Sequence, residues 1–132
     1  MNLKLFIIVL VVYLIIDSIW LKSATNSVYR PVIKAVQNRD IKFNMLGAMV
    51  AYLLLTLGVY YFVLEEGYQS NKKKLIIRAA LFGLIGYGIF NGTNNAIFVN
   101  WDYRVCIIDT LWGICGSVLV SYISNHLYGL KR

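Results

Sequence analysis

The chain has 132 residues, of which 59% are hydrophobic and only 14% are charged, and its mean hydropathy is +0.65. That composition excludes an ordinary soluble domain and predicts a multi-pass membrane protein with one transmembrane domain, residues 1–132. The net charge is +7, but the basic residues stand between the apolar runs, where they favour lipid headgroups and offer no separate face to nucleic acid.

The first apolar run covers residues 3–21 and has no charged residue between Leu5 and Ile16. A secretory signal peptide is the competing interpretation, but no Ala-x-Ala-like cleavage site follows, and the run is long for a signal. We therefore expect a first transmembrane helix that ends in the sequence Asp17-Ser18-Ile19-Trp20-Leu21.

The segment that follows the first span is polar and basic. Val32, Ile33 and Val36 recur at helical spacing after Pro31, the only proline, which suits the first turn of a helix. These residues predict a short interfacial amphipathic helix over residues 31–40. A solvated loop fits the same residues.

Three further apolar runs are each long enough to cross the roughly 30 Å hydrocarbon core as helices, at about 1.5 Å rise per residue. They cover residues 43–64, 75–98 and 103–124. With the first run they predict an all-α integral membrane protein, a four-helix transmembrane bundle with both termini on one side, called side A. The basic residues divide almost evenly between side A and the opposite side B, so the positive-inside rule hardly sets the orientation, although the lysine cluster at residues 72–74 favours cytoplasmic termini.

Small residues line two of these runs at a spacing that lets helix backbones approach closely. They are Ala79, Gly83, Gly88 and Gly92 in the third run, and Gly113, Ser117 and Ser121 in the fourth. Because this is more close-packing surface than one small bundle needs, we expect a homo-oligomer, in the first place a dimer.

Polar side chains gather in the half of the predicted bundle that lies towards side B. Asp17 lies near the B end of the first span, and Asp109 lies six residues into the fourth. Asn91, Asn94 and Asn95, in the B-side third of the third span, have the i, i+3, i+4 spacing that puts them on one helix face. Polar groups in hydrocarbon are costly, and they are usually paired, line a cavity or have a function. We interpret the five residues as one shared polar site.

Each of these groups also has a purely structural interpretation. Asp17 is close enough to the helix end to reach the interface, Asp109 can be a hydrogen-bonded structural acid, and the asparagines can join helices through amide hydrogen bonds. We favour a shared site because independent placement would scatter the five groups across the membrane.

A short internal similarity links the two aspartates. Residues 15–20, Ile-Ile-Asp-Ser-Ile-Trp, resemble residues 107–112, Ile-Ile-Asp-Thr-Leu-Trp. Each segment places Asp and Trp on one helix face at i, i+3, and the two helices run in opposite directions. An inverted repeat and chance similarity between two apolar helices explain six residues equally well.

In these residues the chain resembles the DUF2177 family of small four-span predicted membrane proteins. The resemblance covers nearly the whole chain and rests, in order, on Asp17-x-x-Trp20-Leu21, Thr93-Asn94-x-Ala96, Trp101 and Asp109-x-x-Trp112-Gly113. It implies the four-span fold and the site, and it implies no particular activity. The family usually has Tyr-Asp-Leu before the Thr-Asn pair, where this chain has Phe90-Asn91-Gly92. The resemblance therefore supports no charge-dependent role for the third span.

The predicted solute- or ion-binding residues combine the polar groups with the residues of these motifs. They are Asp17, Trp20, Asn91, Thr93, Asn94, Asn95, Asp109 and Trp112. Buried acids beside amides, in a chain too short to enclose a wide pore alone, favour a transporter or channel for a small polar solute, an ion or a proton.

Two other functions remain open. A structural or accessory membrane protein would use the site only to join helices, and a lipid-modifying membrane enzyme would use Asp17 and Asp109 as an acid/base couple. Catalysis is the less favoured of these because nothing in the sequence identifies a substrate. One histidine and no Cys/His cluster predict no metal site, and we expect no cofactor and no partner other than the lipid bilayer, the solute and further copies of the chain.

Overall fold

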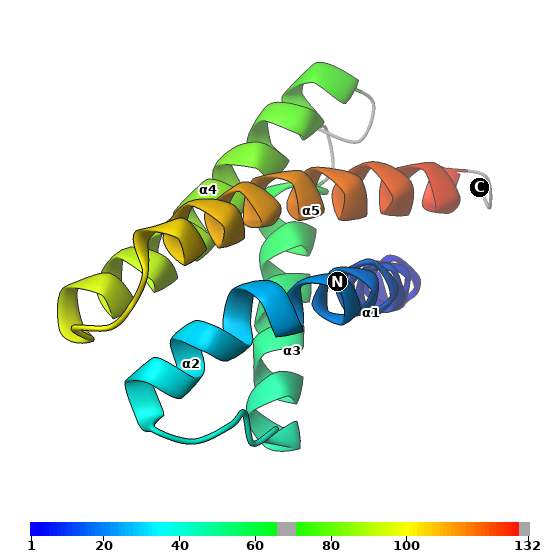
Figure 1. Ribbon diagram of the computed structural model, residues 1–132. Helices are drawn as coiled ribbons and strands as arrows, with labels where there is room; N and C mark the ends of the chain where they lie inside the picture. The colour runs from blue at the N-terminus through cyan, green and yellow to red at the C-terminus, as the bar shows by residue number, and fades with distance from the viewer. Residues whose placement is uncertain (66–70, 130–132) are drawn as a thin grey trace.

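The computed structural model describes residues 1–65 and 71–129, and every regular element in that part of the chain is a helix (Figure 1). Four helices are long and apolar enough to cross a membrane, which confirms the predicted all-α, four-span architecture. The long helices are α1 (Leu3–Ala24), α3 (Met45–Phe62), α4 (Lys72–Ile97) and α5 (Tyr103–Gly129), and the short ones are η1 (Thr25–Tyr29) and α2 (Arg30–Gln37).

Each long helix begins where the sequence supplies a capping side chain. The side-chain oxygens of Asn2, Asn44, Asn71 and Asp102 accept hydrogen bonds of 2.8–3.3 Å from backbone N–H groups in the first turns of α1, α3, α4 and α5. Those N–H groups have no partner within the helix, and a cap supplies one where lipid cannot. The caps, rather than the first apolar residues, therefore set where the helices start.

The first span does not end at residue 21, where the apolar run ends. α1 continues to Ala24 and passes through η1, a π-helical turn, into α2 without leaving helical conformation. α2 carries a proline in its first turn and ends at Asn38, whose left-handed φ of 56° terminates it. Most of the segment predicted as an amphipathic helix, residues 31–40, is thus helical.

α4 and α5 form an antiparallel pair with the most extensive contact between any two described helices, and α3 runs across their direction in Figure 1. The pair depends on Gly83 and Gly113. A Cβ atom on Gly83 would collide with the backbone of Gly113, and one on Gly113 would collide with the ring of Tyr87. Only residues without a side chain allow this approach.

The predicted small-residue stripes are used mainly inside one chain. Their buried members are Ala79, Gly83, Gly113, Ser117 and Ser121. Gly92, by contrast, is exposed, and a Cβ atom on it would meet nothing within 4 Å. Fewer small residues are therefore left exposed for contact between copies of the chain than the sequence indicated. The homo-oligomer stays a prediction.

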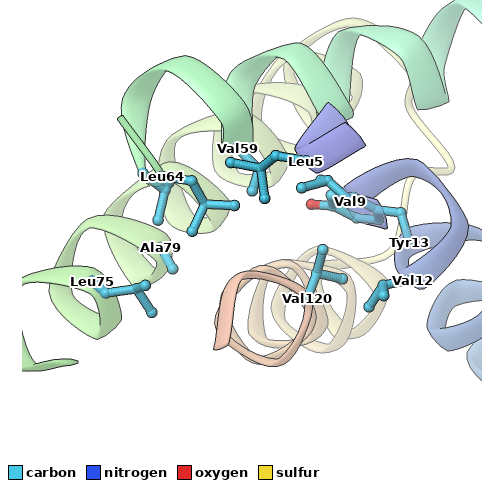
Figure 2. Close-up of a cluster of buried hydrophobic side chains, with 10 residues drawn as sticks. Leu5, Val9, Val12, Tyr13, Val59, Leu64, Leu75, Ala79 and Val120 are labelled. Atoms are coloured by element: carbon cyan, nitrogen blue, oxygen red, sulfur yellow. The ribbon is translucent and has the colours of Figure 1, made fainter. Parts of the chain in front are cut away.

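An apolar core lies in the half of the molecule towards side A. Figure 2 shows side chains from α1, α3, α4 and α5 that point towards one another there. The core residues are Leu5, Val9, Val12, Tyr13, Val59, Val63, Leu64, Leu75, Ala79 and Val120.

The start of α1 lies beside the ends of α3 and α5. The backbone N–H of Asn2 donates to the Tyr60 hydroxyl at 2.6 Å, and its side-chain amide donates to the Tyr128 hydroxyl at 2.7 Å. Helices that alternate in direction across a membrane require this arrangement, which agrees with termini on one side.

At side B, α2 packs against the connection between α4 and α5. Val32, Trp101 and Val105 form a small buried apolar cluster, and the Asn100 side-chain amide donates to the Ala35 carbonyl oxygen at 3.0 Å. These contacts hold η1 beside the first turns of α5. The polar residues of the candidate site lie between this cluster and the core on side A.

The outward faces of the long helices are apolar. Large hydrophobic side chains on these faces are 49–64% exposed; examples are Ile7, Leu54, Ile89 and Leu111. Surface of this kind on every long helix is suited to contact with lipid and not with water.

Candidate functional site

Two aspartates reach similar depth from helices that run in opposite directions. Asp17 lies seven residues before the end of α1, and Asp109 lies six residues after the start of α5, so each is about 10 Å inside its helix from side B. Asp17 is deeper than the sequence indicated because α1 extends to Ala24.

Asp109, which is only 5% exposed, accepts hydrogen bonds from two other elements. The hydroxyl of Tyr29, the last residue of η1, donates to Oδ1. The side-chain amide of Asn91, on α4, donates to Oδ2 at 2.6 Å. These donors replace the water that a carboxyl group would lose on entering hydrocarbon.

Asp17, which is half-buried, has an equivalent pair of donors. The Tyr52 hydroxyl, on α3, donates to Oδ2 at 2.5 Å, and the Trp112 indole N–H, on α5, donates to Oδ1 at 3.0 Å. Each aspartate therefore binds one tyrosine hydroxyl and one nitrogen donor. The two carboxyl groups tie α1, α3, α4, α5 and η1 together.

Two stacked tryptophans join the two halves of the site. The rings of Trp20 and Trp112 lie 4.6 Å apart between centroids and 4° from parallel. Trp112 donates directly to Asp17, whereas the Trp20 indole N–H donates at 2.8 Å to the Tyr29 hydroxyl, which in turn donates to Asp109. The tryptophan of each Asp-x-x-Trp segment thus serves the aspartate of the other, an exchange that is consistent with an inverted repeat.

Asn91 is the most connected of the predicted asparagines and is 1% exposed. Besides Asp109, its amide donates to the Tyr87 carbonyl oxygen at 3.0 Å, and its Oδ1 accepts from the Trp101 indole N–H at 3.4 Å. The Cys106 thiol lies 3.7 Å from its carbonyl oxygen. Asn91 therefore connects the acid to the packed end of the α4–α5 pair.

The structure brings five of the eight predicted site residues together and leaves three outside. Asn95 donates to the Trp101 carbonyl oxygen at 2.9 Å and so shapes the α4–α5 connection. Asn94 is half-buried and Thr93 is exposed. Within the described residues, no hydrogen bond joins these three side chains to either aspartate.

Tyr29 and Tyr52 belong to the site, and the sequence analysis did not identify them. Tyr52 lies in a span that is apolar on every side, so no periodic pattern marks the face that it occupies. Tyr29 is the last residue of the π-helical turn η1, which shifts the helical register. The only available signal was chemical: tyrosine has a hydroxyl that requires a partner in an apolar environment.

Every donor to the two carboxyl groups within the described residues is a neutral side chain. In residues 1–65 and 71–129, no three His, Cys, Asp or Glu side chains lie close enough together to hold a metal ion. The site consists of two carboxyl groups, two phenol hydroxyls, an amide and two indoles. Side chains of these kinds can exchange hydrogen bonds, and a carboxyl group can also gain or lose a proton.

The sequence model of the DUF2177 family, described as a predicted membrane protein, matches residues 2–126. The chain therefore belongs to this family, and with four candidate spans it is a multi-pass membrane protein. No curated protein and no solved structure matches the chain.

Proposed function

We propose that this member of the DUF2177 family is a small proton-linked transporter that binds a polar solute at the Asp17–Asp109 site. One observation carries the proposal: each intramembrane carboxyl group is bound by one tyrosine hydroxyl, which can reverse its hydrogen bond, and by one nitrogen donor, which cannot. Ionisable residues paired in this way inside a membrane are typical of proton relays and substrate pathways.

Proton uptake at Asp109 would change the hydrogen bonds around it in a defined way. A carboxylate only accepts hydrogen bonds, whereas a carboxylic acid also donates one. The Asn91 amide nitrogen cannot accept that bond, but the Tyr29 hydroxyl can. Tyr29 Oη already accepts from Trp20, so on accepting a second bond it would direct its own O–H elsewhere, towards an oxygen of a solute.

The same exchange is available at Asp17. The Trp112 indole N–H only donates, so Tyr52 is the partner that can reverse. Because Tyr52 and Tyr29 lie on different elements, α3 and η1, protonation of the two acids would alter different contacts between helices. Proton binding is thereby coupled to the packing of the helices, which a transporter requires.

The structural alternative assigns the same hydrogen bonds to helix association alone. It has support in the fact that each aspartate joins three elements. The two functions differ in their response to Asp109→Asn. Asparagine has the same size as aspartate and a permanent hydrogen-bond donor, so it mimics the protonated acid. It therefore retains the hydrogen bonds between the helices.

The test measures proton flux into liposomes that contain an internal pH-sensitive dye. The wild type, Asp109→Asn and the control Asp40→Asn, which removes an exposed carboxyl group after α2, are reconstituted at equal density under an imposed pH gradient. We expect flux in the wild type and the control and none in Asp109→Asn, with all three melting at similar temperatures in detergent. Wild-type flux in Asp109→Asn, or no flux above protein-free liposomes in the wild type, would reject proton-linked transport.

A further inference from the structure

The short helix α2 lies alongside the first turns of α5 and runs in the opposite direction. Tyr29, just before α2, donates to Asp109, and Val32 lies in the same apolar cluster as Val105. Further along α2, the Ala35 carbonyl oxygen accepts a hydrogen bond of 3.0 Å from the connection before α5. α2 therefore starts near the level of Asp109, about 10 Å inside α5 at the helical rise, and ends at side B.

The outer face of α2 carries two cations. Arg30 and Lys34 are one turn apart on the face opposite the buried Val32, and both side chains are exposed. In the described part of the chain, neither side chain makes a hydrogen bond, an ion pair or a ring contact. Asp40 follows the end of α2 and Asp102 precedes α5, but neither acid pairs with these two cations.

These cations lie beside surface that is suited to lipid. At the level where α2 begins, α5 exposes apolar side chains: Ile107 is 61% exposed and Ile108 is 37% exposed. Arg30 therefore lies at the edge of the hydrocarbon core, where a cation without a counterion is costly. A long basic side chain can extend towards the headgroups, and the anion that it meets there is lipid phosphate.

We propose that Arg30 and Lys34 bind the headgroup of one anionic phospholipid of the side-B leaflet. Charge complementarity identifies the occupant, because residues 22–42 contain five basic residues and one acidic residue. A lipid also supplies acyl chains for the apolar surface beside the cations, which a free phosphate or a soluble polyanion does not. The site is separate from the two carboxyl groups and does not depend on proton transport.

The first test compares lipids by native mass spectrometry of the full-length protein in detergent. Dioleoyl phosphatidylglycerol and dioleoyl phosphatidylcholine, which have the same acyl chains, are titrated separately, with inorganic phosphate as a third ligand. We expect the first phosphatidylglycerol adduct to form at lower concentration than the first phosphatidylcholine adduct, and no phosphate adduct. Equal binding of the two lipids, or binding of phosphate alone, would overturn the proposal.

Paired charge variants locate the headgroup. Arg30→Gln with Lys34→Gln removes the two cations of α2, whereas Arg39→Gln with Lys42→Gln removes two exposed cations that follow it. Because each basic residue near the headgroups contributes about a fivefold preference for anionic lipid, we expect roughly a 25-fold loss of phosphatidylglycerol affinity in the first variant. The control should lose much less. Equal losses would indicate a diffuse attraction by the whole basic segment and would overturn the site on α2.

A second variant leaves both cations in place. Asn26 is exposed and lies four residues before Arg30 in the same continuous helical segment. Asn26→Glu adds a carboxylate that can pair with Arg30 and repel phosphate, so phosphatidylglycerol affinity should fall, while Asn26→Gln, of the same size and neutral, should bind like the wild type. Unchanged affinity in an Asn26→Glu variant that melts like the wild type, or equal losses in the two variants, would also overturn the proposal.

Discussion

The two halves of the molecule are held together by different interactions. Towards side A, the core is apolar, and three fully buried hydroxyl groups in or beside it, those of Thr56, Ser121 and Ser124, have no hydrogen-bond partner within the described residues. Towards side B, the buried polar side chains of Asn91 and Asp109 are both hydrogen-bonded. The side-A half depends mainly on packing, with hydrogen bonds at Asn2 and between the Tyr13 and Ser117 hydroxyls as additions. The side-B half depends mainly on donors and acceptors.

The contrast follows from the lipid that surrounds the helices in a membrane. Lipid is as apolar as the core, so burying a leucine gains little, and the side-A half depends on close van der Waals contact between helices. A carboxyl group gains much more from a partner, because leaving it unpaired in hydrocarbon costs several kcal/mol. We therefore expect substitutions that change side-chain shape to destabilise the packed surfaces. Substitutions that remove a hydrogen-bond partner should destabilise the polar half.

The largest effect should come from Gly83→Leu, which tests packing between α4 and α5. The added side chain would collide with the Gly113 backbone, so the helix pair must separate, at a cost of about 3 kcal/mol or more. Unfolding in a titration of dodecyl sulfate against mild detergent measures the loss. Gly86→Leu, where the Cβ atom has open space, serves as the control, and equal stability of the two variants would mean that the close approach is not required.

A smaller loss should follow from Asn91→Leu, which tests the polar half. The change removes one donor to Asp109 and the acceptor of the Trp101 indole, and we expect the free energy of unfolding to fall by about 2 kcal/mol. Asn94→Leu, which changes an asparagine outside the network, should alter it by less than about 0.5 kcal/mol. If both variants lose the same stability, the hydrogen bonds of Asn91 contribute nothing particular.

The smallest effect, and one of opposite sign, is expected for Thr56→Val. It removes an unpartnered hydroxyl without changing the shape of the side chain, so stability should be unchanged or higher by up to about 1 kcal/mol. Tyr52→Phe, on the same helix, removes a hydroxyl that donates to Asp17 and should cost about 1 kcal/mol. A clear loss in Thr56→Val would show that its hydroxyl has a partner.

Much of the fold could be predicted because hydropathy marks transmembrane helices strongly. The sequence also placed Asp17, Asn91 and Asp109 in one half of the membrane, and the structure joins Asn91 to Asp109 directly. Helix ends were less accurate. The capping residues Asn44 and Asn71 were visible in the sequence, and reading them as caps would have placed the starts of α3 and α4 at Met45 and Lys72.

The two tyrosine partners of the acids, and the choice among the asparagines, could not be predicted in the same way. A helix that is apolar on all sides, such as α3, gives no periodic signal for the direction of Tyr52. The spacing of Asn91 and Asn95 correctly indicated one face, but one helical turn separates them, and only Asn91 reaches Asp109. The axial offset between two packed helices decides which residue on a shared face contacts a given partner. The spacing of residues within one helix does not determine that offset.

The stacked indoles give this protein a built-in optical signal. The chain has 3 tryptophans: Trp20 and Trp112 form the stack, and Trp101 donates to Asn91. All of its tryptophan emission and indole circular dichroism therefore arise from the site or its immediate neighbour. Two parallel rings at 4.6 Å couple their electronic transitions, so any motion that separates α1 from α5 changes the near-ultraviolet spectrum of the unlabelled protein.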